Sequence, residues 1–214
     1  VDECGNGMHV HIQLKKNDEF IMFDKDGYAG LSKLAHYAIG GILTHAKAIS
    51  AIANPSTNSY KRLVPGFEAP VTIAYATANR SAVIRIPGYT ITADEKRFEL
   101  RSPDATANPY LAYSAIMMAA FDGIINKIDP KVAGFGPYDC NLFDLTPEEQ
   151  SKLDSLPTSL LEAAKELEKD HKFLLSGNVF TENMIKNHIK RIREDHLKVS
   201  RMPHPIEFEM YYSL

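Results

Sequence analysis

The stretch NPSTNSYKRLVPGFEAP, residues 54–70, separates two parts of the sequence that have different hydrophobic patterns. Apolar residues recur at helical spacing before it, over residues 29–53, and three strand-like segments follow it, within residues 71–102. The stretch itself holds three prolines and a glycine, and it therefore predicts a loop. This order of elements indicates the α+β class, with antiparallel strands and long helices packed behind them.

The loop is also the first place to look for chemistry. Long loops inside a compact domain are uncommon, and those that occur are usually lids or binding loops. Its charged side chains, Lys61, Arg62 and Glu68, are therefore the first candidates for a functional role. The alternative is a solvated turn with ordinary surface charges.

Length and composition limit the classes of function. The 214 residues suffice for one large domain or two small ones, and they include no apolar run that could span a bilayer. A net charge of -3, with dispersed lysines and arginines, speaks against a nucleic-acid or membrane surface. Cys4 and Cys140 form neither a metal-binding spacing nor a disulfide framework. Without an export signal we expect a cytoplasmic protein, and the start at Val1 suggests a longer parent.

Residues 5–14, GNGMHVHIQL, combine two glycines with strict alternation of polar and apolar residues. The alternation predicts a strand with His9, His11 and Gln13 on one face. The glycines let the backbone come close to a ligand, because they have no side chain. Two histidines beside such a loop favour a metal or phosphate site over a half-exposed strand with surface histidines.

Three further strands are expected at residues 71–77, 82–87 and 96–102. The first two are expected to pair antiparallel, because only a short turn separates them.

The last of these strands carries the densest charge. Its period of two places Arg97, Glu99 and Arg101 on one face, and the neighbouring segments add Arg80 and Arg85. Several fixed guanidinium groups around one carboxylate suit an anionic ligand such as phosphate or carboxylate. A plain row of surface salt bridges, each contributing roughly 0 to 1 kcal/mol, is the alternative.

The helices are expected behind these strands. Residues 29–53 predict one long helix, in which a close packing contact retains Gly40 and Gly41. Asn108 caps a helix over residues 109–127, which is apolar nearly all round and therefore expected in the core.

The C-terminal third is predicted to be helical. Capping patterns mark helix starts at residues 146–149, at 159–162 and at Thr181. The apolar-aromatic tail, residues 203–214, is too short for a core of its own, so we expect it to contact a partner subunit.

Several motifs occur in a fixed order along the chain. They are GxGMHxH at 5–11, the stretch at 54–70, NRS at 79–81, IRIP at 84–87, RxExRxPD at 97–104, ANPYL at 107–111 and PHPIEFE at 203–209. Together they closely resemble the bacterial type I glutamine synthetases over the whole chain. The resemblance implies the catalytic-domain fold of that family.

The resemblance also implies which part of the domain the chain represents. Residues 1–214 correspond to the C-terminal, larger portion of the catalytic domain, without the N-terminal domain and the first catalytic strands. Residues 1–127 form the strand and core-helix part that carries the site, and residues 128–214 form a helical region and the C-terminal tail.

The activity implied is the ATP-dependent ligation of ammonia to glutamate through a γ-glutamyl phosphate intermediate, with two or three Mg or Mn ions per site. By resemblance, His9 and Glu99 correspond to ligands of a metal ion, and Glu68 corresponds to a flap residue that helps take a proton from ammonium. The positions that correspond to contacts with glutamate and the transferred phosphoryl group are Gly5, Arg62, Arg80 and Arg101. The positions on the ATP side are His11, Gln13, Arg80, Arg85 and Arg97. Glu68 and Arg80 are the catalytic candidates.

Three positions depart from the family pattern. Cys4 stands where the family usually has asparagine, and Gln13 where it often has serine. Phe143 stands where some enterobacterial members have a tyrosine modified with AMP, so we expect that this control is absent.

The resemblance leaves alternatives and implies partners. A γ-glutamyl-polyamine or related glutamate-amine ligase would use the same arginines and metals, and a non-catalytic structural relative would share the fold. The family assembles as two stacked hexameric rings, and we expect the same homo-oligomer here, with no nucleic acid or membrane partner. Residues 1–214 alone are expected to be inactive, because further metal ligands lie upstream in the family.

Overall fold

The computed structural model describes residues 5–65, 69–77, 81–139, 146, 148 and 153–213. A four-stranded sheet has the order β1-β6-β5-β4, and a separate hairpin pairs β2 with β3. The strands are β1 (Val10–Ile12), β2 (Lys15–Lys16), β3 (Glu19–Phe20), β4 (Thr72–Thr77), β5 (Ala82–Ile86) and β6 (Phe98–Leu100). The helices are η1 (Tyr28–Gly30), α1 (Lys33–Thr44), α2 (Ala46–Ala53), α3 (Ser59–Arg62), α4 (Pro109–Asn126), α6 (Leu160–Lys169), η3 (Lys172–Asn178), α7 (Glu182–Ser200) and α8 (Pro205–Tyr211).

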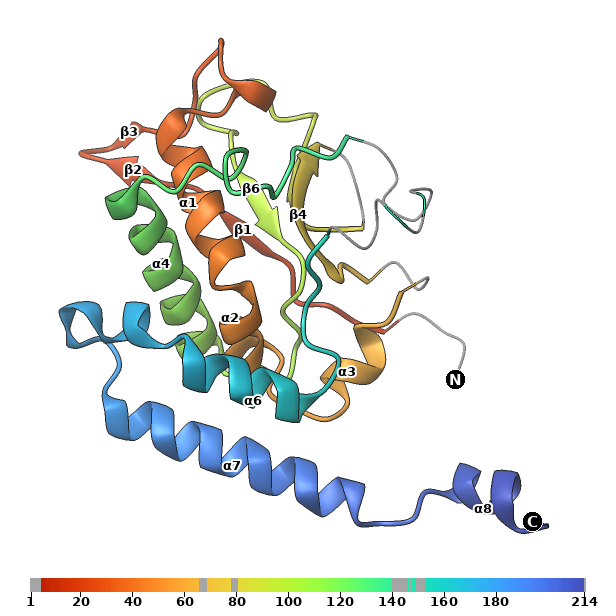
Figure 1. The fold of residues 1–214 in the computed structure, drawn as a ribbon. Helices are drawn as coiled ribbons and strands as arrows, with labels where there is room; N and C mark the ends of the chain where they lie inside the picture. Colours follow the sequence, from red (N-terminus) through yellow and green to blue (C-terminus); the bar gives the residue numbers. More distant parts are fainter. Residues whose placement is uncertain are drawn as a thin grey trace.

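The elements form layers. Helix α1 packs against β4 and β5 and, on its other side, against α4, while α2 contacts α4 and α6. Helix α7 packs alongside α6, and α8 stands apart from the body (Figure 1). Strands on one side and helices behind them confirm the predicted α+β class.

The prediction for the pairing of β4 with β5 was wrong. These strands are parallel, with Thr72 opposite Ala82 and Thr77 opposite Ile86, whereas β5–β6 and β6–β1 are antiparallel. The five-residue step from Thr77 to Ala82 can span about 17 Å when extended, which equals the rise of β4. A short connection therefore does not force antiparallel pairing here.

The helix expected over residues 29–53 is two helices. The first of them, α1, begins at Lys33 rather than at residue 29, because the Ser32 side chain caps it by accepting a hydrogen bond from the backbone N–H of Ala35 (3.3 Å). The predicted helix is interrupted at His45, whose φ of -96° and ψ of 8° are not helical. Apolar periodicity continues through this residue, so the pattern alone could not reveal the break.

The side chain of His45 joins three helical elements at the break. Its Nδ1 lies 2.7 Å from Asp170 at the end of α6, and its Nε2 lies 3.2 Å from Asp122 on α4. Its ring stacks on Phe173 with 3.9 Å between centroids. Burial alone lowers the pKa of His45, but the hydrogen bonds and charges of Asp170 and Asp122 raise it above its ordinary value.

The glycines in α1 allow the close helix contact that was predicted. A Cβ on Gly41 would lie 2.1 Å from the carbonyl oxygen of Ala119 on α4, and one on Gly40 would lie 2.1 Å from that of Ile128. On the facing helix, a Cβ on Gly123 would lie 2.1 Å from the carbonyl oxygen of Tyr37. The α1–α4 contact therefore depends on the absence of side chains.

Helix α4 was predicted to lie in the core, but only one of its faces is buried. Alanines and Gly123 face the core, but Tyr110, Phe121 and Ile125 are 83%, 45% and 71% exposed. The part of the chain that the structure describes covers one face of this helix, which explains the difference. Its cap is as predicted, because the Asn108 side chain accepts from the backbone N–H of Tyr110.

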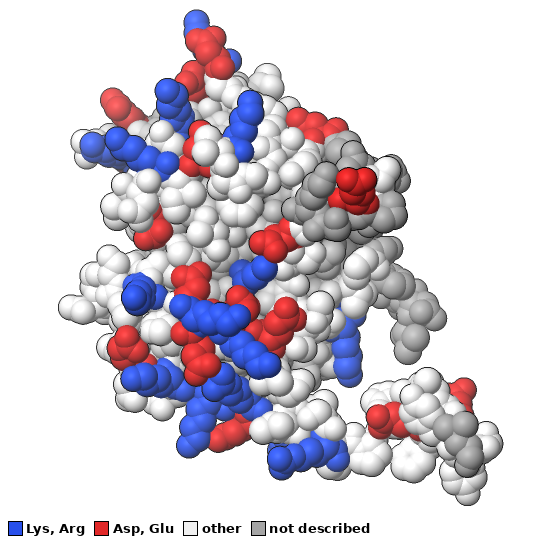
Figure 2. Space-filling view, viewed as in Figure 1, with Lys and Arg blue, Asp and Glu red and all other residues white. Residues whose placement is uncertain are grey.

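The later helix starts at Ser159 and Thr181 are also confirmed by side-chain caps. The start predicted at residues 146–149 includes residues outside the described ranges. In Figure 2, lysines and arginines are interspersed with acidic residues on the face shown, most densely over α6 and α7. No helix within the described ranges is long and apolar enough to cross a membrane.

Replacing Gly41 with alanine is expected to destabilise the fold. The added methyl group would meet the backbone of α4, which cannot yield as a side chain can, and overpacking of this kind costs about 2 kcal/mol or more. Thermal unfolding of the full-length protein measures the change. Gly88→Ala is the control, because a Cβ there meets nothing within 4 Å. An equal thermal midpoint for both variants would contradict the packing argument.

His45→Gln is expected to lower stability more at pH 5.5 than at pH 8.5. Because the folded pKa of His45 is raised, the stabilisation is fully present below the unfolded value of about 6.5 and is lost as pH rises through the folded pKa. Thermal midpoints of the parent and variant at both pH values test this. A difference that grows toward high pH would show the wrong sign.

Candidate functional site

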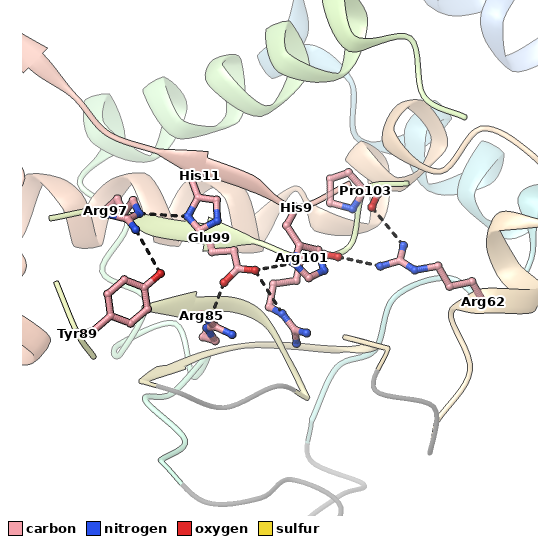
Figure 3. Close-up of polar contacts among 9 residues, drawn as sticks. All are labelled: His9, His11, Arg62, Arg85, Tyr89, Arg97, Glu99, Arg101 and Pro103. Atoms are coloured by element: carbon pink, nitrogen blue, oxygen red, sulfur yellow. Dashed lines mark hydrogen bonds and ion pairs between the residues drawn. The ribbon is translucent and has the colours of Figure 1, made fainter. Parts of the chain in front are cut away.

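The site is built around the carboxylate of Glu99 on β6. The residue is 2% exposed, and β-sheet pairing places it opposite His11 on β1 and opposite Arg85 on β5. Its Oε1 lies 2.7 Å from Nδ1 of His9 and 3.7 Å from Nε of Arg101. Its Oε2 lies 3.1 Å from Nε of Arg85 (Figure 3). The sheet therefore brings together the charged residues predicted to share one face.

The second oxygen of this carboxylate keeps its hydrogen-bonding capacity. The approach of Arg85 to Oε2 of Glu99 is an ion pair, but its angles do not form a hydrogen bond, and Oε2 accepts none from the described residues. A buried oxygen of this kind is unusual, and it marks a place for a ligand, an ion or a water molecule.

The imidazole of His9 lies in a positive environment. Burial lowers its pKa, the Glu99 carboxylate opposes this, and the charges of Arg101 and Arg62 lower it further, so that the pKa lies below the ordinary value. The neutral imidazole that results is the form that binds metals.

His9 and Glu99 fit a divalent cation in distance and chemistry. Two neighbouring ligands of an octahedral ion with bonds of about 2.1 Å are about 3 Å apart, close to the 2.7 Å between Nδ1 and Oε1. Oε2, which accepts no hydrogen bond from the described residues, is a further oxygen that could bind the ion. Among the described residues no group of three or more histidine, cysteine or acidic side chains could hold a metal ion. This pair alone could therefore supply only part of a coordination shell.

Arg62 lies at the end of α3, a four-residue helix inside the stretch predicted to be entirely a loop. Mutual hydrogen bonds between Ser56 and Ser59 open this turn, a local signal that the prolines concealed. The Arg62 guanidinium donates through Nη1 to the carbonyl oxygens of Ser102 (2.8 Å) and Pro103 (3.2 Å). Its Nη2 donates to that of Arg101 (3.0 Å).

The two glycines before β1 pack directly on Arg62. A Cβ on Gly5 would lie 2.9 Å from Cγ of Arg62, and one on Gly7 would lie 2.5 Å from its Nη2. The glycine segment therefore allows a close approach, and the group that approaches in this structure is the side chain of Arg62. The predicted approach of a ligand stays a prediction.

Sequence reasoning missed a buried polar network behind Arg62. Asp104 is 5% exposed, and its carboxylate accepts from Nδ2 of Asn54 (3.2 Å) and from the backbone N–H of Thr106 (2.9 Å). Nδ2 of Asn54 also donates to the carbonyl oxygen of Ser102 (2.7 Å), the same oxygen that Arg62 holds. The Ser-Pro-Asp turn after β6 was the available signal, since aspartate in a turn often bonds the backbone two residues on.

The other end of the site holds His11, Gln13 and Arg97. Nε of Arg97 donates to Nδ1 of His11 (3.3 Å), and its Nη2 donates to the hydroxyl of Tyr89 (3.2 Å). Nε2 of Gln13 donates to the carbonyl oxygens of Asp94 (2.7 Å) and Lys96 (3.2 Å). These side chains therefore hold the segment before β6 against β1. Tyr89 was not singled out in the sequence, because its segment has no recognisable pattern.

Several positions that the sequence singled out lie outside the described residues: Cys4, Glu68, Arg80, Cys140 and Phe143.

Asp104→Ala is expected to destabilise the site. It leaves the amide of Asn54 and the N–H of Thr106 without their carboxylate acceptor, and an unsatisfied buried polar group costs about 1–3 kcal/mol. A lower thermal midpoint and faster proteolysis within residues 54–65 are the expected readouts. Asp195→Ala, an exposed substitution on α7, is the matched control, and equal behaviour of the two variants would refute the structural role.

The geometry can be compared with known proteins. The model of the family described as "Glutamine synthetase, catalytic domain" matches residues 1–211. The chain is 53% identical over 213 residues to a glutamine synthetase of Aquifex aeolicus, covering 100% of this chain and 44% of that protein. It is 52% identical over 210 residues to the glutamine synthetase of Escherichia coli strain K12, with 98% and 44% covered.

Solved structures agree. The glutamine synthetase of Plasmodium falciparum has a TM-score of 0.82 and 33% identity, covering 98% of this chain and 47% of that chain. Apo GmaS has a TM-score of 0.80 and 33% identity, with 98% and 45% covered. The chain thus spans less than half the length of these relatives. With a family model over nearly all of its residues and relatives more than half identical, the chain belongs to the glutamine synthetase catalytic-domain family.

Proposed function

We propose that the protein containing this chain is a glutamate–ammonia ligase, which joins ammonia to glutamate at the expense of ATP through a γ-glutamyl phosphate. The observation that carries the proposal is the buried Glu99 carboxylate, flanked by His9, Arg85 and Arg101 in a chain of this family. Two guanidinium groups against one carboxylate leave a positive site, which suits an anionic substrate and a transferring phosphoryl group.

The arginines and glycine near Arg62 are proposed to bind glutamate. Arg62 and Arg101 would contact its carboxylate and the phosphoryl group, together with Arg80, and the backbone of Gly5 would line the same place. The side chains of Arg62 and Arg101 are fixed by carbonyl contacts and by the ion pair with Glu99, so they would meet the substrate without rearranging.

His9 and Glu99 are proposed as ligands of a Mg or Mn ion. When bound, such an ion offsets the negative charge that develops on the transferred phosphoryl group. Arg85 and Arg101 hold the Glu99 carboxylate in place for this role. Two or three ions per site are expected, with the other ligands outside the described residues.

His11, Gln13, Arg80, Arg85 and Arg97 are proposed to form the ATP side. Glu68 is proposed as the flap carboxylate that takes a proton from ammonium and shields the intermediate from water.

The assembly is proposed to be two stacked hexameric rings, in the cytoplasm. Exposed apolar side chains on α8 and directly after it support the use of the tail in subunit contacts, since Phe208, Met210 and Tyr212 are 58%, 57% and 88% exposed. Residues 1–214 alone are proposed to lack turnover, because their described residues supply only part of the metal shell.

The decisive experiment measures glutamine formation by the full-length protein. ATP, glutamate and ammonium are supplied with Mg or Mn, and putrescine replaces ammonium in a parallel reaction. A higher kcat/KM for ammonium supports the proposal. A preference for putrescine would instead identify a glutamate-amine ligase, and no ATP-dependent product with either would overturn the assignment.

Glu68→Ala is expected to lower kcat by about 100-fold or more while the Kd for ATP stays within twofold, since a positioned proton acceptor contributes about 100- to 10,000-fold. Steady-state rates and equilibrium ATP binding on the full-length protein separate the two effects. Glu19→Ala, an exposed position on β3, serves as control. A kcat near that of the parent would remove Glu68 from the mechanism.

A further inference from the structure

The segment between β5 and β6, residues 87–97, is held firmly although much of it is exposed. Lys96 is 4% exposed, and its Nζ donates to the carbonyl oxygen of Thr90 (2.5 Å). The Thr90 hydroxyl in turn donates to the carbonyl oxygen of Pro87 (2.8 Å). Gln13, which directly follows β1, donates through Nε2 to the carbonyl oxygens of Asp94 and Lys96 in this segment. The segment is therefore a fixed support for whatever it carries.

It carries Tyr89, whose side chain lies against Arg97. The Tyr89 hydroxyl accepts from Nη2 of Arg97 at 3.2 Å, and Cζ of Arg97 lies 5.5 Å from the ring centroid, within the range of a cation–π contact. Tyr89 is nevertheless 65% exposed. A large aromatic side chain that is both exposed and fixed in this way is well placed to act on a ligand.

Tyr89 completes the set of contacts that fixes the guanidinium plane of Arg97. Nε donates to His11 (3.3 Å) and Nη2 donates to Tyr89 (Figure 3). Nη1 donates to the carbonyl oxygen of Glu95 (2.9 Å). Among the described residues three of its five N–H donors find acceptors, which leaves two donors and one guanidinium face for a bound group. Since an arginine loses much side-chain freedom on binding, holding it beforehand strengthens binding.

We infer that Tyr89 is a positioning residue for the nucleotide, acting through Arg97. The inference rests on the proposed function, which assigns Arg97 to the ATP side, and adds to it a residue outside the motifs of the family. Tyr89 holds the Arg97 guanidinium at the orientation that meets a nucleoside triphosphate, and it does not itself contact the reacting atoms. Replacing a surface tyrosine without this role would change neither the Kd nor the KM for ATP.

The test uses the full-length protein with Tyr89→Ala and Tyr89→Phe. Equilibrium Kd for ATP with Mg, KM for ATP, KM for glutamate and kcat are measured for each. The alanine variant is expected to raise the Kd and KM for ATP about three- to tenfold, the combined loss of a hydrogen bond and a cation–π contact. The KM for glutamate and kcat stay within twofold. The phenylalanine variant keeps the ring over Arg97 and is expected to raise the same constants only about two- to threefold.

Tyr110→Ala provides the matched control, because Tyr110 is an exposed tyrosine on α4 and is not part of the site. Thermal midpoints equal to that of the parent establish that the variants are folded. ATP constants within twofold of the parent for Tyr89→Ala, or an equal rise in the KM for glutamate, would overturn the inference while the ligase activity stands. Absence of ligase activity in the parent would instead overturn the proposed function.

Discussion

The buried carboxylate of Glu99 constrains both the sheet and the site. An unpaired charge in the interior is very unfavourable, so the carboxylate requires partners with good geometry. Its three partners come from different parts of the chain: His9 precedes β1, Arg85 lies on β5 and Arg101 follows β6. A slip of one residue in β6 would turn Glu99 to the opposite face and bring Phe98 and Leu100 out of the core. The same pairing register of β6 therefore determines both which side chains are buried and where the Glu99 carboxylate lies.

The same cluster makes the surroundings of Glu99 locally positive although the chain has a small negative net charge. Arg85 and Arg101 both contact one carboxylate, while burial and the nearby arginines favour a neutral His9. The local balance is therefore positive, and the partly buried guanidinium groups are held by fixed contacts rather than by mobile surface pairs. Such groups act in a low local dielectric, where their effect on developing charge is larger than in water.

The sequence was sufficient for features that depend on neighbouring residues. Periods of two placed His9 and Glu99 correctly, and the side-chain caps at Asn108, Ser159 and Thr181 started the helices as predicted. Gly41 was correctly read as a close contact, because glycine in mid-helix is otherwise unfavourable.

Features that depend on distant partners could not be predicted in this way. The break at His45 depends on Asp122 and Asp170, which are 77 and 125 residues away. The parallel direction of β4 and β5 depends on how the sheet is assembled, and the length of the connection allowed either direction. Asp104 and Tyr89 acquire their roles from Arg62 and Arg97, so only the folded chain identifies them.

Arg62 shows how a side chain with a structural role can keep donors for the binding role proposed for it. Of its five N–H donors, three hold the carbonyl oxygens of residues 101–103, and within the described part of the chain the other two have no acceptor. The carbonyl contacts fix the guanidinium plane, and the asparagine-aspartate network behind residues 102–104 fixes those carbonyls in turn. Two donors on a fixed guanidinium can still pair with a carboxylate. A lysine could not replace it, because an ammonium group lacks the planar fork that serves both purposes.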